Sequence, residues 1–237
     1  MNAWRLEQHA ELASTSDEVV RRAKMGEPAG LAVLALKQTA GRGSRGRAWS
    51  APEGNLNLSV LLRPTRPAAD AGLFSLICGL AVVEALERHG AKGLRLKWPN
   101  DILCAGAKLA GILIDAAPGD AFLDWLVIGV GVNLKSTPEI PGRRTTCLAD
   151  QGVEISAQTA AATILARLEV WVEAPASAIR EAWQEKAHPP GTRIEIAFAG
   201  QRRVGMFVGL SHSGELLLRC ENRIETINTG EVLLADG

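Results

Sequence analysis

Hydrophobic and polar positions follow two different patterns along this chain. Up to about residue 187, apolar runs of strand length are interleaved with segments that are apolar at helical spacing. We expect strands at residues 31–37, 56–62, 94–98, 109–115 and 125–133. We expect helices at residues 14–26, 73–88, 159–173 and 176–186. Ser14-Thr15-Ser16-Asp17 would cap the first helix and Gly26 would end it, so this part is expected to be an α+β domain.

The pattern changes after His188-Pro189-Pro190-Gly191. Short alternating runs follow at residues 193–197, 201–210, 215–220 and 223–228, and turn residues separate them. Such runs are typical of a small all-β barrel. The sequence therefore predicts one domain over residues 1–187 and a second, small one over residues 190–237.

Charge and composition narrow the class of protein. The 237 residues include 26 basic and 26 acidic side chains, so no overall field points to a nucleic acid or a membrane surface as the partner. The most apolar stretch, 113–134, is interrupted by three aspartates, which excludes an ordinary membrane span. No secretory signal is evident, and the cysteines form no C-x-x-C pair. These features argue against a metal or disulfide framework and fit a reducing cytoplasm.

The strongest chemical signal is the segment QTAGRGSRGRAW at residues 38–49, which we call the Gly/Arg loop. Its glycines allow backbone N–H groups to converge on an anion. Its arginines add charge and a planar fork suited to phosphate or carboxylate oxygens. The spacing fits neither a Walker loop nor the dinucleotide-binding fingerprint. The loop therefore predicts a small bound anion such as a nucleotide, with a flexible basic surface loop as the alternative.

Three further segments carry candidate chemistry: KWPND at 97–101, KLAGILID at 108–115 and GVGVNL at 129–134. Taken singly, each is equally well explained by packing, by a solvated edge charge or by a strand bulge. In this order, and together with Ser14-Thr15, the Gly/Arg loop, GNLNLS at 54–59 and TGEV at 229–232, they closely resemble biotin protein ligases. The resemblance covers essentially the whole chain.

The resemblance implies a fold and a reaction. The fold is an SH2-like mixed-sheet catalytic domain, shared with lipoate ligases, followed by a small SH3-like β-barrel. In the reaction, biotin and ATP form biotinyl-5′-AMP and pyrophosphate. The adenylate then biotinylates one lysine of a biotin carboxyl carrier protein, the acceptor domain of a biotin-dependent carboxylase. ATP and biotin are thus substrates, and Mg²⁺ is expected to be held mainly by the ATP phosphates rather than by a protein metal site.

The resemblance also assigns roles to residues at matching positions. Those expected to act in catalysis are Lys108, Arg42 and Asp101. Those expected to bind biotin are Ser14, Thr15, Ser16, Gln38, Gly41, Arg42, Gly43, Ser44, Ser59, Lys108 and Gly111. Those expected to bind ATP or the adenylate are Arg45, Arg47, Trp49, Lys97, Asn100 and Asn133. Asp101 would hold Lys97 or a loop arginine, or assist a metal ion or the acceptor lysine, and the sequence does not choose among these.

Two positions depart from the family pattern. Ser16 stands where asparagine is more common, so one contact to biotin would be lost or mediated by water. Ser44 stands where many members carry an arginine that helps to retain the adenylate. We therefore expect weaker retention of the reactive anhydride by this chain.

The sequence also bears on the possible partners of this chain and on alternative functions. The pattern begins within about fifteen residues of the start, too few for a DNA-binding domain of the kind some members carry, so no operator binding is expected. The strand at 125–134 is apolar enough to pair across a homodimer or to be buried in a monomer. The rivals are a lipoate or octanoate ligase, a non-catalytic biotin-binding protein, and an oligonucleotide-binding role for the barrel. The last is disfavoured because the barrel's only aromatic residues are Phe198 and Phe207.

Overall fold

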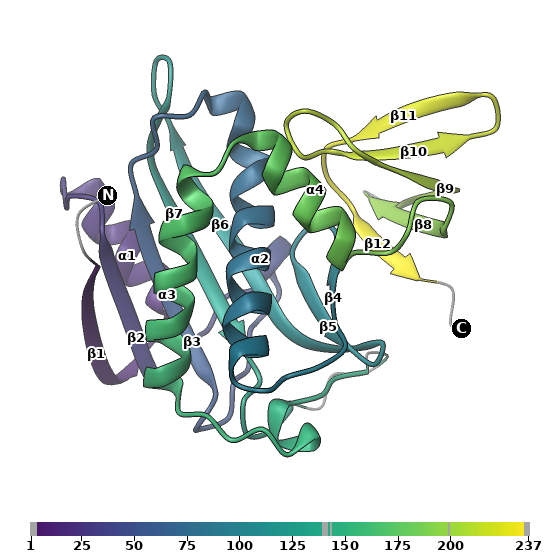
Figure 1. The fold of residues 1–237 in the computed structure, drawn as a ribbon. Helices are drawn as coiled ribbons and strands as arrows, with labels where there is room; N and C mark the ends of the chain where they lie inside the picture. Colours follow the sequence, from purple (N-terminus) through teal and green to yellow (C-terminus); the bar gives the residue numbers. More distant parts are fainter. Residues whose placement is uncertain (1–3, 139–141, 143, 199, 235–237) are drawn as a thin grey trace.

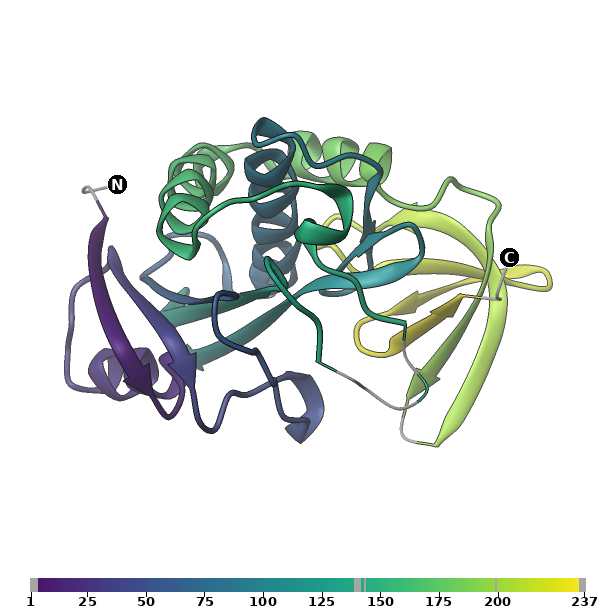
Figure 2. The same ribbon diagram turned by 90° about the horizontal axis from the view of Figure 1, so that it is seen from below.

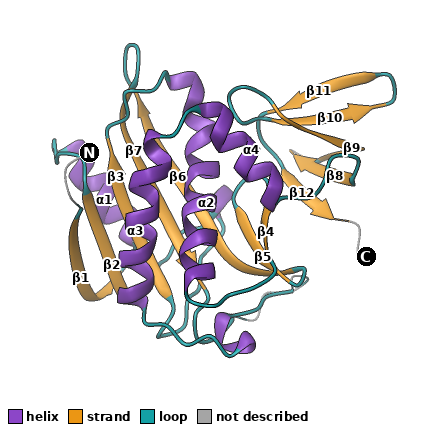
Figure 3. Cartoon of the chain, viewed as in Figure 1, coloured by secondary structure: helices purple, strands orange, loops and turns teal. Residues whose placement is uncertain are grey.

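The computed structural model describes residues 4–138, 142, 144–198 and 200–234. It contains two β-sheets, with helices packed on the larger one (Figures 1 and 3). The larger sheet has the strand order β1-β2-β3-β7-β6-β5-β4, and every neighbouring pair is antiparallel except β1 and β2. Its strands are β1 (Arg5–Leu12), β2 (Leu31–Gln38), β3 (Leu56–Leu62), β4 (Leu94–Lys97), β5 (Asp101–Cys104), β6 (Ala107–Pro118) and β7 (Leu123–Val132).

Helices cover both faces of this sheet, as Figure 2 shows. One face carries α1 (Thr15–Lys24), and the other carries α2 (Leu73–Arg88), α3 (Ala157–Glu173) and α4 (Ala176–Lys186). Alternate residues of β2 therefore pack into two cores. Leu31 and Val33 join the core beneath α1, and Ala32 and Leu34 join the core beneath α2 and α3. Burial on both faces explains why this strand is a continuous apolar run rather than an alternating one.

The α2 helix is the central helix of the larger core. Residues 68–88 are long and apolar enough, by composition alone, to cross a membrane, but 67% of the most apolar window is buried inside the fold. The helix packs against α3, α4 and the sheet, and 12 of its 16 residues are buried. Such a position is that of a core helix in a globular protein.

The second sheet lies at the C-terminal end of the described chain. Its strands are β8 (Arg193–Phe198), β9 (Gln201–Leu210), β10 (Leu216–Cys220), β11 (Arg223–Ile227) and β12 (Glu231–Leu234). The strands are antiparallel in the order β11-β10-β9-β8-β12. Because β12 pairs with β8 and not with β11 in the described part of the chain, the expected barrel is an open five-stranded sheet.

The structure also contains strands that the sequence pattern did not predict. These are β1, β5 and β12. Most residues of β1 are exposed because it is an edge strand, and β5 and β12 are each only four residues long. The strand at 125–134 corresponds to β7, which pairs with β3 and β6 in the same chain, so it is buried within one subunit. The remaining expected strands and helices are confirmed, with bounds shifted by a few residues at most.

The first prediction concerns the link between the two sheets. The buried Trp98 indole donates a hydrogen bond to the Gly214 carbonyl, with an Nε1–O distance of 3.1 Å. We expect Trp98→Phe to lower the free energy of unfolding by about 1–2 kcal/mol, because it leaves this buried carbonyl without its donor. Trp171→Phe is the control, since the Trp171 Nε1 has no hydrogen-bond partner among the described residues. Equal losses for the two variants in urea unfolding would contradict the prediction.

Candidate active site

A cavity opens near the middle of the larger sheet, between the start of α1 and the Gly/Arg loop. Its floor is formed by β6 and β7 at positions without a side chain, which are Gly111, Gly129 and Gly131. A methyl group on Gly131 would overlap the Trp49 ring, and one on Gly129 would lie 2.5 Å from the Ser16 Oγ. Glycine is required here because other side chains lie directly on the backbone.

Neutral polar side chains gather at one end of the cavity. The Thr15 hydroxyl lies 2.8 Å from the Ser59 hydroxyl, and the Ser16 hydroxyl lies 3.1 Å from it. The Gln38 amide oxygen accepts from the Thr15 backbone N–H at 2.7 Å, and its nitrogen donates to the Asn57 Oδ1 at 3.1 Å. All but Gln38 are buried, so this cluster presents fixed donors and acceptors rather than charge.

The helix that carries two of these residues is fixed by its cap. The Ser14 hydroxyl accepts from the Asp17 backbone N–H at 3.2 Å, as expected for an N-cap. Ser14 itself does not line the cavity. Its role in the structure is to hold Thr15 and Ser16 at the start of α1.

An acidic side chain lies between two lysines beside the cavity. The buried Asp101 carboxylate forms an ion pair with the Lys97 ammonium at 3.0 Å and another with the Lys108 ammonium. Burial raises the pKa of the Asp101 carboxyl, but the attraction of Lys108 and Lys97 outweighs it, and the net pKa lies below its usual range. The pair with Lys97 is one of the contacts expected for Asp101, and the pair with Lys108 was not expected.

Lys108 is one of the cationic residues that line the cavity, and an aromatic ring lies beside it. Its ammonium is 5.7 Å from the centroid of the Trp49 ring, within the range of a cation–π contact. The same ring lies over Gly131, and its Nε1 is buried without a hydrogen-bond partner among the described residues. The ring therefore occupies space directly above the glycine floor of the cavity.

The Gly/Arg loop forms a small hairpin above the cavity. The Gly43 N–H donates to the Arg47 carbonyl at 2.8 Å, and the Trp49 N–H donates to the Gly41 carbonyl at 2.9 Å. The loop's first arginine, Arg42, lines the cavity and pairs with two carboxylates, Asp17 at 2.5 Å and Asp115 at 2.8 Å. Its guanidinium is thus held at the mouth of the cavity.

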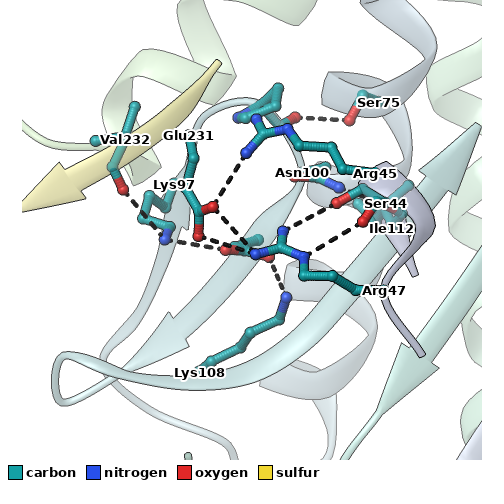
Figure 4. A network of polar contacts seen from close by, with 12 residues as sticks. Ser44, Arg45, Arg47, Ser75, Lys97, Asn100, Lys108, Ile112, Glu231 and Val232 are labelled. Carbon is teal, nitrogen blue, oxygen red and sulfur yellow. Dashed lines mark hydrogen bonds and ion pairs between the residues drawn. The ribbon is translucent and has the colours of Figure 1, made fainter. Parts of the chain in front are cut away.

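The other two loop arginines have a different partner. Arg45 and Arg47 both pair with Glu231 at the start of β12, and each Nη1–Oε2 distance is 3.0 Å (Figure 4). Neither arginine lines the cavity. Arg45 has a φ of 59°, in the left-handed region that a non-glycine residue adopts only in a tight turn. The C-terminal sheet therefore takes part in holding the loop.

Two asparagines brace the strands beneath the cavity. The Asn100 side chain lines the cavity and donates to the Ile112 carbonyl at 2.6 Å. Asn133 lies outside the cavity wall and donates to the Thr146 carbonyl at 3.1 Å. Its buried Oδ1 has no hydrogen-bond partner among the described residues.

The structure thus brings together most, but not all, of the residues expected from the sequence. Those that line the cavity are Thr15, Ser16, Gln38, Arg42, Gly43, Ser44, Trp49, Asn100, Lys108 and Gly111. Those that do not are Ser14, Gly41, Arg45, Arg47, Ser59, Lys97, Asp101 and Asn133. The lining residues that were not expected are Asn57, Leu58, Ile112, Leu113, Gly129, Val130 and Gly131. Asn57 could have been found as a polar residue within an apolar strand, and the two glycines as bare positions within another.

Comparison with known families places this chain clearly. Residues 13–133 match the Biotin/lipoate A/B protein ligase family, and residues 191–234 match the Biotin protein ligase C terminal domain. The biotin–[acetyl-CoA-carboxylase] ligase of Paracoccus denitrificans is 34% identical in an alignment that covers 84% of this chain and 88% of that protein. The enzyme of the same name from Mycobacterium tuberculosis is 32% identical in an alignment that covers 98% of this chain and 90% of that protein.

Solved structures give the same result. The biotin protein ligase from Aquifex aeolicus in complex with biotin and ATP has a TM-score of 0.82 and 28% identity, covering 98% of this chain and 99% of that one. The biotin protein ligase from Leishmania major in complex with biotinyl-5-AMP has a TM-score of 0.64 and 30% identity, covering 99% of both chains. The similarity therefore includes both sheets and extends over nearly the whole chain.

A prediction follows from the buried carboxylate. Asp101→Asn leaves Lys97 and Lys108 without their counter-ion, and we expect a loss of about 3 kcal/mol in the free energy of unfolding at pH 7. Because the folded-state pKa of Asp101 is depressed, its contribution is fully present above the unfolded value of about 3.9. It is lost as the pH falls through the folded value.

The difference between the wild-type protein and Asp101→Asn should therefore shrink below about pH 4. Unfolding measured at a series of pH values checks this. Asp124→Asn, which removes an exposed pair with Arg63, is the control and should cost less than about 1 kcal/mol. A gap for Asp101→Asn that stays constant down to pH 3 would contradict the assignment.

Proposed function

Because this chain belongs to the biotin/lipoate A/B protein ligase family, we infer that it is a biotin protein ligase, which activates biotin with ATP and attaches it to an acceptor protein. In the first step, the biotin carboxylate attacks the α-phosphorus of ATP, and pyrophosphate leaves. In the second step, the acceptor lysine amine attacks the carbonyl carbon of biotinyl-5′-AMP. An amide forms, AMP leaves, and the amine loses its proton.

The observation that carries the residue assignments is the pairing of a fixed cation with a neutral polar cluster in one cavity. Adenylation brings together two anions, so positive charge and N–H donors should lower its barrier more than a general base would. Lys108 and Arg42 line the cavity and are each held by carboxylates. We assign Lys108 to the oxygens of the carbonyl and the α-phosphate in both steps, and Arg42 to the closing of the loop over them.

The neutral cluster suits the other end of biotin. A ureido ring carries N–H donors and a carbonyl acceptor but no charge, and it needs partners of the same kind. The hydroxyl and amide groups of Thr15, Ser16 and Gln38 offer such partners at the cavity wall. Ser59 lies behind them and orients the two hydroxyls. Asp101 serves as a positioning residue for Lys108.

The Trp49 ring lies within the cavity, directly against Gly131 and Gly111, so it covers part of the floor. We propose that substrate binding displaces the ring, which then offers its face to the adenine. The loop's few backbone bonds and exposed arginines make this rearrangement inexpensive.

The proposal also covers the acceptor protein and the Mg²⁺ ion. The acceptor would be a biotin carboxyl carrier protein, the acceptor domain of a biotin-dependent carboxylase such as those named in the relatives' activities. Mg²⁺ would arrive on the nucleotide phosphates, because Asp101, the carboxylate beside Lys108, is already neutralised by two lysines. The free cysteines at positions 78, 104, 147 and 220 support a cytoplasmic location, where thiols stay reduced.

The first test of this function is biotin-dependent release of pyrophosphate from ATP, with lipoate as a parallel substrate. We expect activity with biotin alone, and a loss of roughly 10²–10³-fold in kcat for Lys108→Ala, as for the removal of one donor to a developing negative charge. Lys37→Ala, which removes an exposed lysine paired with Glu11, is the control and should leave activity unchanged.

Three results would change the assignment. Activity with lipoate instead of biotin would make the protein a lipoate ligase. Tight biotin binding without pyrophosphate release would make it a non-catalytic binding protein. Full activity in Lys108→Ala would remove the catalytic role of this lysine.

A further prediction concerns retention of the intermediate. The Ser44 hydroxyl, at the cavity wall, accepts from the Arg47 Nη2 at 3.2 Å and offers no charge to the adenylate. We expect Ser44→Arg to slow the release of biotinyl-5′-AMP about tenfold, because a charge-assisted hydrogen bond to phosphate would be gained. Release of the labelled adenylate in the absence of acceptor measures this. Ser50→Arg, at an exposed position, is the control, and equal release by both variants would contradict the prediction.

A further inference from the structure

One carboxylate from the C-terminal sheet lies among the cations of the catalytic domain (Figure 4). Glu231 begins β12, yet its side chain reaches the Gly/Arg loop, which lies 184–186 residues earlier in the sequence. Its Oε2 accepts from the Arg45 Nη1 and the Arg47 Nη1 at 3.0 Å each, and its Oε1 lies 3.3 Å from the Arg47 Nη1. One carboxylate thus occupies both guanidinium groups.

The cations around Glu231 continue toward the cavity. The Lys97 ammonium lies 3.4 Å from the carbonyl oxygen of Val232, the next residue of β12. The same ammonium pairs with Asp101, and Asp101 pairs with Lys108, which lines the cavity. The carboxylate of Glu231 therefore lies at the outer end of a group of cations whose inner end is at the cavity.

Two guanidinium groups that each donate from Nη1 to the oxygens of one carboxylate form an arrangement that also suits a phosphate group. We propose that Glu231 is an internal counter-anion for Arg45 and Arg47, and that phosphate oxygens of the bound nucleotide replace it when the loop closes. The inference rests on the proposed function, because it takes the nucleotide as the ligand of these arginines. It makes Glu231 a positioning residue for Arg45 and Arg47 in the ligand-free protein.

The strength of the contact favours exchange. The side chains of Arg45, Arg47 and Glu231 are 37%, 40% and 19% exposed, so these ion pairs are weak and sensitive to salt. A polyphosphate carries several charges, so it can replace the single carboxylate at the guanidinium groups of both arginines. In the ligand-free protein, Glu231 keeps the two arginines outside the cavity, so the nucleotide must compete with it.

The competition predicts the direction in which nucleotide affinity changes when Glu231 is replaced. Removing the charge of Glu231 releases the arginines and should strengthen nucleotide binding, whereas a merely structural contact would weaken it when removed. The biotin end of the cavity is formed by neutral residues. None of the hydrogen bonds described for these residues involves Glu231, so the affinity for biotin should not change. The C-terminal sheet would then set the affinity for ATP and not the affinity for biotin.

The test compares two carboxylates that each bridge two arginines. Glu231→Gln removes the proposed competitor. Glu225→Gln is the matched control, since Glu225 bridges Arg203 and Arg223 within the C-terminal sheet at 2.6 and 2.7 Å. Binding is measured by calorimetry with an ATP analogue in which a methylene group replaces the oxygen between the α- and β-phosphorus atoms. Pyrophosphate release gives the KM values for ATP and biotin and the kcat.

For Glu231→Gln we expect analogue binding three- to tenfold tighter and a KM for ATP lower by the same factor, with the biotin KM and kcat unchanged. Glu225→Gln and Glu231→Asp should behave as the wild-type protein does. In the ligand-free Glu231→Gln protein, trypsin should cleave after Arg45 and Arg47 faster than in the Glu225→Gln protein. This readout reports loop release without relying on activity.

Analogue binding that is unchanged or weaker in Glu231→Gln would overturn the inference, even if the wild-type enzyme is fully active. Wild-type protein that binds the analogue but releases no pyrophosphate with biotin would overturn the proposed function instead. The two failures are therefore distinguishable.

Discussion

The site depends on how the sheet brings one buried carboxylate between two lysines. In the β4–β5 ladder, Lys97 lies directly opposite Asp101, and in the β5–β6 ladder Asp101 lies opposite Gly111. A register shift in β5–β6 then places Lys108 opposite Leu103. Because Gly111 has no side chain, the Lys108 ammonium can turn back over it, to within 3.2 Å of where a Cβ would be. Strand register, one irregularity and one glycine thus fix the position of the cation.

The cavity has a neutral end and a charged end. The neutral end rests on α1 and β3, whose polar residues are buried and bonded to one another, and it is therefore rigid. The charged end rests on the Gly/Arg loop, whose arginines are partly exposed and held by ion pairs that salt weakens. Under the proposed function, the fixed wall would recognise an uncharged group and the loop would capture charged groups.

Most strands and helices and most of the cavity wall could be predicted from the sequence. The elements and contacts that were missed were missed for physical reasons. Buried strands such as β3 and helices such as α2 are long, apolar and bounded by turn residues, so their pattern is clear. The edge strand β1 is mostly exposed, and an exposed edge carries no apolar pattern. The motifs located most of the cavity wall, because residues that touch a ligand lie in short unusual runs. They could not locate the partner of Arg45 and Arg47, since a single glutamate far away in the sequence looks like any surface residue.

The distance in sequence between the loop and Glu231 has a consequence for synthesis. The two arginines and their carboxylate are 184–186 residues apart, so on the ribosome the loop emerges long before β12 does. A nascent chain can therefore fold the glycine floor and the hydroxyl cluster while its loop arginines still lack this anion. The pairing of Arg45 and Arg47 with Glu231 can form only after β12 has emerged, and contacts of such sequence separation close slowly.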